Sequence, residues 1–373
     1  MSFLSNMFGK KKTKSVLGVD IGSSSLKVVQ LRREGETAVL ETYGELALGP
    51  YAGNEVGQAT NLPADKIAET LVDLLREANV TTNDAGISIP FSRSLLRLIT
   101  LPRRDDPNEQ RTMVELEARK YIPVPVSEVQ LDWFVVPEPL SEGAAPSDKM
   151  RILIVAVHND ELSLLQGVVE GAKLATSFYE IEIFSTIRSV VDEPVRPVLV
   201  LDIGASASKV YVVEHGVVAF SHNIPTGGQD VTRAIATANG MTVKQAEVSK
   251  KEHGFIKNTD GVNVATTGSG AVTYDRKSIE LVFSRIFEET KRVLTQYELG
   301  SQKSVAAIVL TGGGGVTKDL ASYAKEFFAI DIQLADPFGK VEAPVFMRPV
   351  LAEIGPEFAV AVGLALRKLE EVQ

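Results

Sequence analysis

Hydrophobic and polar positions follow the same pattern in two widely separated stretches of the chain. Residues 16–31 (VLGVDIGSSSLKVVQL) and 198–213 (VLVLDIGASASKVYVV) both consist of two apolar, β-branched runs joined by a turn of small residues. Runs of this kind predict a β-hairpin. A further apolar run follows each stretch, at 37–48 and 217–225, and predicts a third strand.

The polar residues of the two stretches repeat along with the apolar ones. The offset is constant, since 202 − 20 and 209 − 27 both equal 182. At this offset Asp20 aligns with Asp202, Gly22 with Gly204, Ser24 with Ser206 and Lys27 with Lys209. Chance repetition of an apolar strand would not carry these residues along. The sequence therefore predicts two related halves, divided near the middle of the chain.

Other segments have the apolar spacing of amphipathic helices. Residues 64–80 place Ile67 and Leu71 on one face. The same kind of pattern predicts helices over 228–240, 242–254 and 278–300. The first two of these end at a glycine, as helices often do. Residues 305–315 predict a buried strand that runs into a loop of four glycines.

The segment 84–179 has no counterpart in the other half. Its pattern predicts strands and helices in the order β-α-β-β-α, which is typical of a small α+β insert of domain size. Residues 137–149 are rich in Pro, Ser and Gly and predict an exposed loop between two strands of this insert.

The composition is that of an ordinary globular protein: of 373 residues, 44% are apolar and 23% are charged. The net charge of −9 argues against a general nucleic-acid binder, which needs excess Lys and Arg. Cys is absent and there are only four His, so neither a disulfide framework nor a dedicated zinc site is expected. No uncharged apolar run reaches about 18 residues, so we expect a cytoplasmic protein.

The first 14 residues, MSFLSNMFGKKKTK, join a short apolar segment to four lysines. Such a segment could touch an anionic lipid surface. A frayed, soluble terminus explains the same residues and is commoner at chain ends. The sequence leaves both interpretations open.

Each hairpin carries the pattern Asp-x-Gly-small-x-small-x-Lys, which suits phosphate binding. Glycine permits a sharp turn, small residues let backbone N–H groups approach anionic oxygens, and the lysine returns beside them on the next strand. Asp20 and Asp202 could share one Mg²⁺ through water, because magnesium gives up its hydration reluctantly. A duplication that kept its turns for folding alone is the alternative, but it leaves two carboxylates at the ends of apolar strands unexplained.

A third candidate element is the loop Gly312–Gly315, between a buried strand and a predicted helix. Backbone at such a position can lie against a nucleotide base or phosphate, with helix-terminal N–H groups nearby. Glycine-rich turns also occur without ligands, so this loop by itself decides nothing.

The order of these motifs resembles that of the actin-like ATPase superfamily, which includes FtsA, MreB and the DnaK-type chaperones. The resemblance covers nearly the whole chain: phosphate loops at 16–31 and 198–213, connecting helices at 179–191 and 354–367, and an adenosine loop at 308–315. It implies an α/β fold of two RNase H-like halves with an inserted α+β subdomain. Ala and Gly in the second connecting helix would let the two connecting helices cross closely.

The resemblance implies the domain ranges. The first half would comprise 1–83 and 180–197, the insert would be 84–179, and the second half would be 198–373 with a subdomain at about 226–300.

The resemblance also implies roles for individual residues, with ATP or ADP and Mg²⁺ as cofactors. Glu182 stands where relatives carry the Gln or Glu that orients the attacking water. Glu247 and Lys250 would contact ribose and adenine, although a solvated ion pair at i and i+3 explains them without the family. The predicted nucleotide-binding set is Asp20, Gly22, Ser23, Ser24, Ser25, Lys27, Asp202, Gly204, Ala205, Ser206, Gly228, Glu247, Lys250, Gly312, Gly313 and Gly314. Relatives often have Asp or Gly at the position of Ala205. This difference concerns how the metal is held and how fast ATP is hydrolysed more than it concerns nucleotide binding.

Within the superfamily, an insert in the first half is typical of FtsA-like proteins. Residues 90–102 and 115–136 resemble the PilM family of type IV pilus assembly proteins. FtsA-like proteins continue into a linker and a membrane-binding helix, whereas this sequence stops at Gln373, so we expect a PilM-type rather than an FtsA-like division protein.

The PilM resemblance implies a cytoplasmic, nucleotide-loaded clamp at the inner face of the membrane. Its insert would bind the cytoplasmic N-terminal tail of the inner-membrane protein PilN, which would provide peripheral membrane association. Contacts with pilus motor components and self-association fit the same family. Two other classes stay open: a scaffold that holds ATP with little or no hydrolysis, and a sugar kinase on the same fold, for which the sequence offers no clear acceptor site.

Overall fold

The computed structural model describes residues 14–136, 148–192, 196–255, 263–265, 271–273 and 276–371. The apolar and lysine-rich start of the chain lies almost entirely outside the described residues. Most of the predicted exposed loop at 137–149 lies outside them as well.

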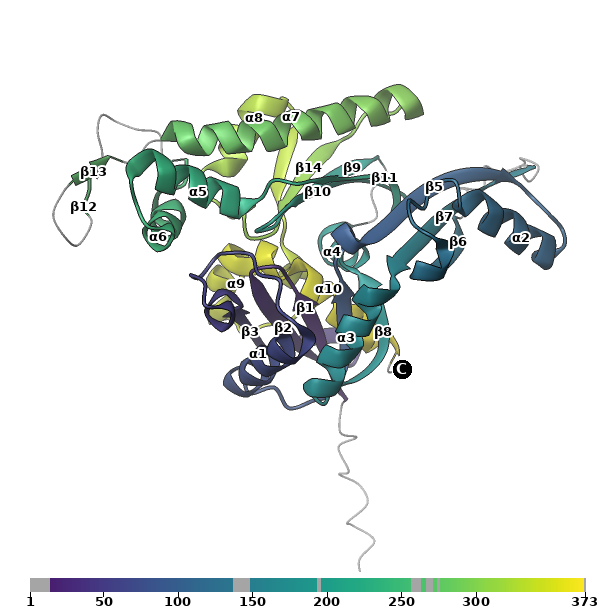
Figure 1. Ribbon diagram of the computed structural model, residues 1–373, viewed down its shortest axis with the longest axis horizontal. Helices are drawn as coiled ribbons and strands as arrows, with labels where there is room; N and C mark the ends of the chain where they lie inside the picture. Colours follow the sequence, from purple (N-terminus) through teal and green to yellow (C-terminus); the bar gives the residue numbers. More distant parts are fainter. Residues whose placement is uncertain are drawn as a thin grey trace, which may run out of the picture.

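The first half is built on a five-stranded mixed sheet (Figure 1). Its strand order is β3-β2-β1-β4-β8, with β1 Ser15–Ile21, β2 Ser25–Glu34, β3 Thr37–Ala47, β4 Asp84–Ile89 and β8 Ala175–Ile181. The first three strands form an antiparallel meander, and β4 and β8 run parallel to β1. The predicted hairpin and third strand are confirmed.

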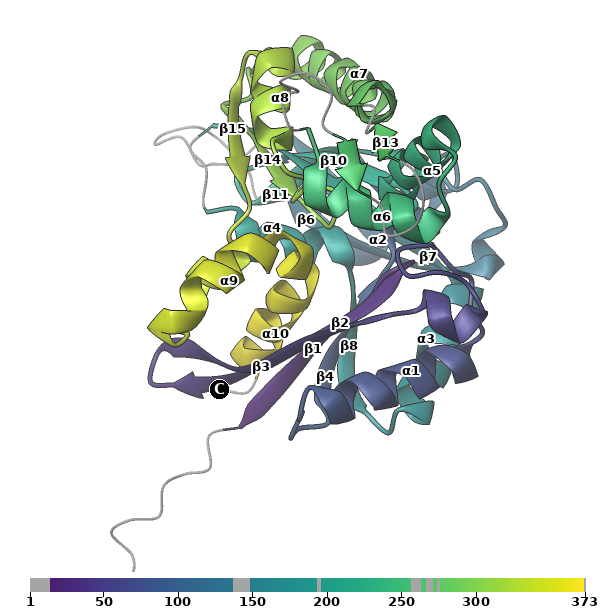
Figure 2. The ribbon, with the colours of Figure 1, turned by 90° about the vertical axis from the view of Figure 1, so that its left-hand side faces the viewer.

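Both faces of this sheet are covered by helices, which explains why β1 is apolar on both sides. Leu17 and Val19 face the cluster that includes residues of α1 (Ala64–Glu77) and α3 (Asn159–Gly171). Val16, which precedes Leu17 and points to the opposite face, packs with residues of α10 (Ala359–Glu371). Figure 2 shows α10 on one side of β1 and β2, and α1 and α3 on the other.

The second half repeats the same sheet topology. Its strand order is β11-β10-β9-β14-β15, with β9 Val198–Ile203, β10 Ser208–Glu214, β11 Val217–Ile224, β14 Ala307–Thr311 and β15 Asp331–Leu334. The helices of this half are α5 Gly228–Asn239, α6 Val243–His253, α7 Arg276–Ser301 and α8 Leu320–Phe328. A short antiparallel pair, β12 Asn263–Ala265 and β13 Ala271–Thr273, follows α6. The matching topology confirms the repeat predicted from the sequence.

A separate three-stranded sheet lies beside the two halves. Its order is β5-β7-β6, with β5 Ser94–Pro102, β6 Val129–Val136 and β7 Lys149–His158, and α2 Pro107–Ala118 packs on it. β5 contacts β11 of the second half (Figure 1). This sheet and α2 form the inserted module, and its root is where the chain enters it after β4 and leaves it at α3. At the root, Arg93 Nε lies 3.8 Å from Glu161 Oε2, so an ion pair links the two ends of the module.

The packing differs in two places from the predicted ranges of the halves and the insert. The predicted insert, 84–179, contains β4 and most of β8, but these strands belong to the first sheet, where β4 pairs with β1 and β8 pairs with β4. The predicted second half contains α10, whose apolar residues pack on the first sheet. The division into domains stays a prediction, and these contacts favour an insert limited to the chain between β4 and α3.

The two connecting helices are α4 (Glu182–Val190) and α10, and they cross closely as predicted. A methyl group on Gly363 would lie 1.9 Å from the carbonyl oxygen of Ser185, so no larger residue fits at this crossing. The predicted first connecting helix begins three residues too early, because Tyr179–Ile181 complete β8 before the helix starts at Glu182.

One described segment, Val345–Glu371, is long and apolar enough to cross a membrane by length and composition alone. It comprises the short helix α9 (Arg348–Ile354), a 3-10 turn and α10. Of its most apolar window, 61% is buried within the protein. Its apolar character is therefore accounted for by the core between the first sheet and α4.

Candidate functional site: a cavity between the two halves

A cavity of about 810 Å³ opens between the two halves. Every residue predicted from the sequence for nucleotide binding or catalysis lines it: Asp20, Gly22, Ser23, Ser24, Ser25, Lys27, Glu182, Asp202, Gly204, Ala205, Ser206, Gly228, Glu247, Lys250, Gly312, Gly313 and Gly314. These residues come from both hairpins, α4, α5, α6 and the glycine loop. The structure therefore brings together positions as far apart in sequence as Asp20 and Gly314.

The two hairpin turns have the same backbone geometry. The amide of Gly22 donates to the carbonyl oxygen of Ser25 over 3.1 Å, and the amide of Gly204 donates to that of Ala207 over 3.0 Å. A methyl group on either glycine would lie within 3 Å of the same carbonyl, at 2.8 Å and 2.9 Å. The shared Asp-x-Gly pattern is thus explained by one tight turn used twice.

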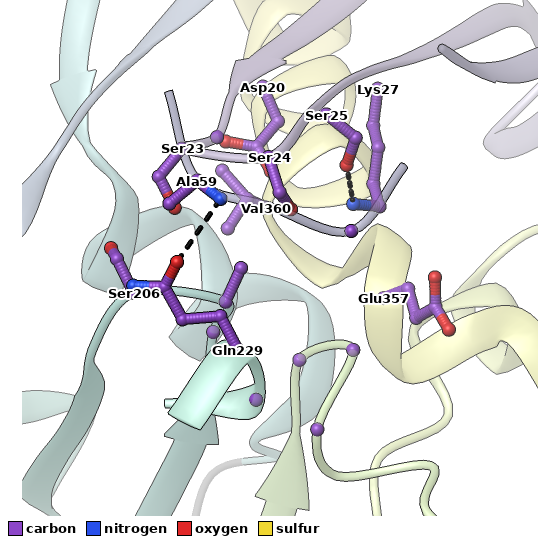
Figure 3. Close-up of a pocket in the computed structure, with 18 of the residues that line it drawn as sticks. Asp20, Ser23, Ser24, Ser25, Lys27, Ala59, Ser206, Gln229, Glu357 and Val360 are labelled. Atoms are coloured by element: carbon purple, nitrogen blue, oxygen red, sulfur yellow. Dashed lines mark hydrogen bonds between the residues drawn. The ribbon is translucent and has the colours of Figure 1, made fainter. Parts of the chain in front are cut away.

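The first turn is fixed in place by the loop that follows β3. The amides of Leu48 and Thr60 donate to the carbonyl oxygens of Ser24 and Ser23 over 2.9 Å and 2.8 Å. The amide of Ala59, on the same loop, donates to Gln229 Oε1 on α5 over 3.3 Å (Figure 3). This contact joins the two halves across the cavity mouth.

The second turn is fixed by the start of α5. The amides of Gly228 and Gln229 donate to the carbonyl oxygens of Gly204 and Ala205, each over 2.9 Å. A methyl group on Gly227 would lie 2.5 Å from the Ala205 oxygen. Glycines at this contact therefore allow a helix N-terminus, which favours anions, to lie directly beside the predicted phosphate loop.

The glycine loop approaches the second hairpin as closely as the backbone permits. Gly312 has φ +79°, a left-handed conformation that favours glycine. A methyl group on Gly312 would lie 2.3 Å from Asp202 Oδ1, and one on Gly314 would lie 2.3 Å from Ile203. At least two of the four glycines are thus required by the packing around Asp202.

Lys209 lies between two buried carboxylates at the floor of the cavity. Its Nζ donates to Glu182 Oε2 over 2.7 Å and to Asp202 Oδ2 over 3.1 Å. Burial opposes the charge of Lys209, but Asp202 and Glu182 outweigh it and raise the pKa of Lys209 well above its ordinary value. Lys209 was absent from the predicted set of site residues, although its alignment with Lys27 in the repeated pattern was a signal for it.

Glu182 uses both of its carboxylate oxygens within the protein. While Oε2 accepts from Lys209, Oε1 accepts from the backbone N–H of Phe91 over 2.6 Å. Phe91 follows β4, where the chain enters the insert. Glu182 therefore lines the cavity as predicted, and Lys209 takes up one acceptor position of the oxygen, Oε2, that could orient a water molecule.

Lys27, the counterpart of Lys209, has different neighbours. Its Nζ donates to Ser25 Oγ over 2.8 Å and lies 3.0 Å from Glu45 Oε1 on β3 (Figure 3). Burial opposes the charge of Lys27, but Glu45 and Asp20 raise its pKa above the ordinary value. Glu45 and Glu357, which also lines the cavity, were not predicted as site residues.

Asp20 is a carboxylate whose negative charge is incompletely compensated. Burial, opposed in part by Lys27 and reinforced by Glu182, raises the pKa of Asp20 from 3.8 to about 6. A cation in the cavity would provide the missing compensation.

The site offers carboxylates for a hydrated metal rather than a preformed protein cage. Within the described part of the chain, no three His, Cys, Asp or Glu side chains lie close enough together to hold a metal ion. Asp20 and Asp202 line the same cavity, and two carboxylates with water and phosphate oxygens are a donor set that suits Mg²⁺. The residues present therefore fit this ion.

Glu247 and Lys250 form a buried ion pair rather than a solvated one. Lys250 Nζ donates to Glu247 Oε2 over 2.6 Å, and Thr232 Oγ1 contacts both groups, at 2.9 Å and 2.6 Å. Burial lowers the pKa of Lys250. A methyl group on Gly57 of the first half would lie 2.8 Å from the Glu247 side chain, so this pair also lies where the two halves meet.

The comparison with known families agrees with this geometry. A family model described as type IV pilus assembly protein PilM matches residues 18–369, nearly the whole chain. The chain belongs to this family. A solved structure described as the PilM–PilN type IV pilus biogenesis complex is similar to it with a TM-score of 0.78 and 27% identity, over 95% of this chain and 98% of that chain.

More distant relatives confirm the actin-like fold. The cell division protein FtsA of Neisseria meningitidis is 25% identical over 94% of this chain and 90% of its own length. MreB5 of Spiroplasma citri bound to AMPPNP has a TM-score of 0.56 and 13% identity over 97% of this chain and 98% of its own. The predicted fold and PilM-type assignment are confirmed, and the likeness to FtsA is a distant relationship.

Proposed function

We propose that this PilM-family protein binds ATP and ADP with Mg²⁺ between its halves and links nucleotide state to pilus assembly. The observation that carries the proposal is that all the nucleotide-binding positions predicted from the sequence line one cavity. Two turns of small residues, the positive end of the α5 helix dipole and Lys27 offer favourable contacts for a triphosphate.

In this proposal each hairpin binds the phosphates from one side. Lys27 would contact the phosphates from the first half, and the turn at Gly204 would contact them from the second. Asp20 and Asp202 would hold Mg²⁺ through water, and the bound ion would neutralise phosphate charge. Glu247 and Lys250 would lie on the nucleoside side, near the glycine loop.

Nucleotide binding is tested first with the double variant D20A/K27A. We expect it to bind AMPPNP with Mg²⁺ at least about tenfold more weakly than wild type, because a charged contact to phosphate and a metal ligand are both lost. K325M, which removes one charge from an exposed position on α8, is the matched control and should bind normally. Wild-type affinity in D20A/K27A would overturn the proposed phosphate site.

The rate of hydrolysis separates a slow ATPase from a nucleotide-holding scaffold. Because the charge of Glu182 is paired with Lys209, and Phe91 fixes its other oxygen, we expect slow phosphate release by wild-type protein. If Glu182 orients the attacking water, E182A should release phosphate more slowly still. A rate unchanged in E182A would remove the hydrolytic role from this residue.

We further propose that the protein acts in the cytoplasm, at the inner face of the membrane, through the N-terminal tail of PilN. The similar solved complex contains PilN, which supports this partner. The insert exposes apolar side chains that suit a docking surface: Leu116 is 56%, Phe134 43% and Val135 41% exposed. Contact with motor components and self-association are further parts of the proposal that no residue described here singles out.

Deleting 84–179 would not test this partner surface, because the deletion would also remove two strands of the first sheet. Single substitutions in the full chain are the better experiment. L116D and V135D should each weaken capture by an immobilised PilN N-terminal peptide, whereas L299D, at a residue 70% exposed on α7, should not. Equal binding by all three variants would exclude the insert as the docking surface.

A further inference from the structure

Lys209 lies at the centre of a charged contact between the two halves. Glu182 belongs to α4, which connects the first sheet to the second, whereas Asp202 on β9 and Lys209 on β10 are paired neighbours. The side chains of Lys209, Glu182 and Asp202 are only 14%, 10% and 8% exposed. The Lys209–Glu182 ion pair is therefore a buried link across the floor of the cavity.

The neighbours of Lys209 explain why its ammonium group turns inward. In the first hairpin, Lys27 lies opposite Glu45 on the third strand and contacts Ser25 in the turn. At the corresponding places the second hairpin has Asn223 and Ala207, which offer no carboxylate and no hydroxyl. Lys209 instead contacts the two carboxylates that line the cavity.

The same position brings Lys209 close to the second turn. A methyl group on Gly204 would lie 3.7 Å from Lys209 Nζ, and Gly204 lines the cavity. The ammonium group is thus within reach of an anion bound at this turn. A phosphate group there would compete with Glu182 for the same positive charge.

We propose that Lys209 is a second phosphate-binding lysine, which Glu182 and Asp202 hold until the phosphates of the nucleotide draw it away. This inference rests on the proposed function. Binding of phosphate by Lys209 then releases Glu182 Oε2 toward the cavity, while Oε1 keeps its contact with Phe91 at the root of the insert. The ion pair thereby makes the release of Glu182 depend on a bound phosphate.

A set of three variants separates this role from that of a simple counter-ion. K209M should bind AMPPNP with Mg²⁺ about tenfold or more weakly than wild type, because it loses a charged contact to phosphate. E182Q should bind it a few-fold more tightly, because the competitor for Lys209 is removed. The double variant K209M/E182Q has the same net charge at the site as wild type, and it should still bind about tenfold more weakly.

The measurement is equilibrium binding of AMPPNP and of ADP, with K325M as the charge-matched control and thermal melting as the check of folding. If K209M does not fold, the test is made with K209M/E182Q. This variant also lacks the carboxylate of Glu182, so only Asp202 loses the charge of Lys209. Wild-type affinity in K209M/E182Q would show that Lys209 is only a counter-ion and would overturn the inference. If wild-type protein itself binds no AMPPNP, the proposed function fails instead.

Discussion

The hairpin β1–β2 and the hairpin β9–β10 share a turn but differ in what lies beside their lysines. The first keeps Lys27 on Ser25 and on Glu45, whose side chain is 39% exposed. The second has lost both kinds of neighbour, and its lysine contacts carboxylates in the interior. A tight turn requires glycine at its closest contact, whereas the side chains on the strands that follow can differ between the two hairpins. The comparison indicates that the duplicated elements kept one backbone geometry and acquired separate electrostatic roles.

A second difference concerns the helix that covers each central strand. At the repeat offset, Gly18 of β1 corresponds to Val200 of β9. A methyl group on Gly18 would lie 2.0 Å from the carbonyl oxygen of Ala361 on α10, so helix and strand backbones are in direct contact. Val200 packs in the same apolar cluster as Ile183 and Ile187 of α4. At this position β1 is therefore in direct contact with a helix backbone, whereas β9 carries an apolar side chain.

The largest effect is expected from making β1 resemble β9 at this position. G18A should lower the free energy of unfolding by about 3 kcal/mol, because the new methyl group meets the backbone of α10. Chemical denaturation of the full chain measures the change. G300A makes the same substitution at an exposed position on α7 with open space around it, and should change stability by less than about 1 kcal/mol. Equal effects would refute the close contact.

An intermediate effect, which depends on pH, is expected at Asp20. Its folded-state pKa of about 6 lies above the ordinary 3.8, so the folded protein binds the proton more tightly than the unfolded chain. Protonation of Asp20 therefore stabilises the folded protein at low pH, and this stabilisation is lost as the pH rises through the folded-state pKa of about 6. D20N should therefore melt at a higher temperature than wild type at pH 8, by the equivalent of about 1 kcal/mol or more.

The advantage of D20N should shrink at pH 5, where much of Asp20 is already protonated in the folded protein. Both measurements are made without nucleotide and with EDTA present, so that no metal compensates the carboxylate. An advantage of the same size at both pH values would show that the pKa of Asp20 is not raised.

The smallest effect is expected from giving the first hairpin the neighbour that the second one has. E45N replaces the carboxylate opposite Lys27 by the amide that lies opposite Lys209. It should tighten AMPPNP binding by about two- to fivefold, because a partly exposed negative charge at the cavity is removed. Weaker binding would show instead that Glu45 positions Lys27 for phosphate.

The elements that were predicted correctly are those whose pattern of apolar, polar and glycine residues is local. The hairpins, the amphipathic helices and the glycine loop each depend on residues within one short segment. Asp20 and Asp202 were recognised as site residues because the repeat places both at the ends of apolar strands. That they line the same cavity is a finding of the structure that agrees with the prediction.

The parts that the sequence analysis missed depend on contacts between distant segments. β8 was assigned in part to a helix because its residues precede α4 without a break in the apolar pattern. The pairing of β4 with β1 and of β8 with β4, and the packing of α10 on the first sheet, have no local signature. The partners of Lys209 were missed for the same reason, since Glu182 and Asp202 come from different elements.

The root of the inserted module has a consequence for how such proteins diversify. Both ends of the module attach at the rim of the cavity, where Arg93 and Glu161 face each other and line it. A lineage can therefore replace the module at this single junction while both main sheets stay intact. Recognition of new partners can evolve in this way while the cavity between the halves stays unchanged, with each new module attached next to it.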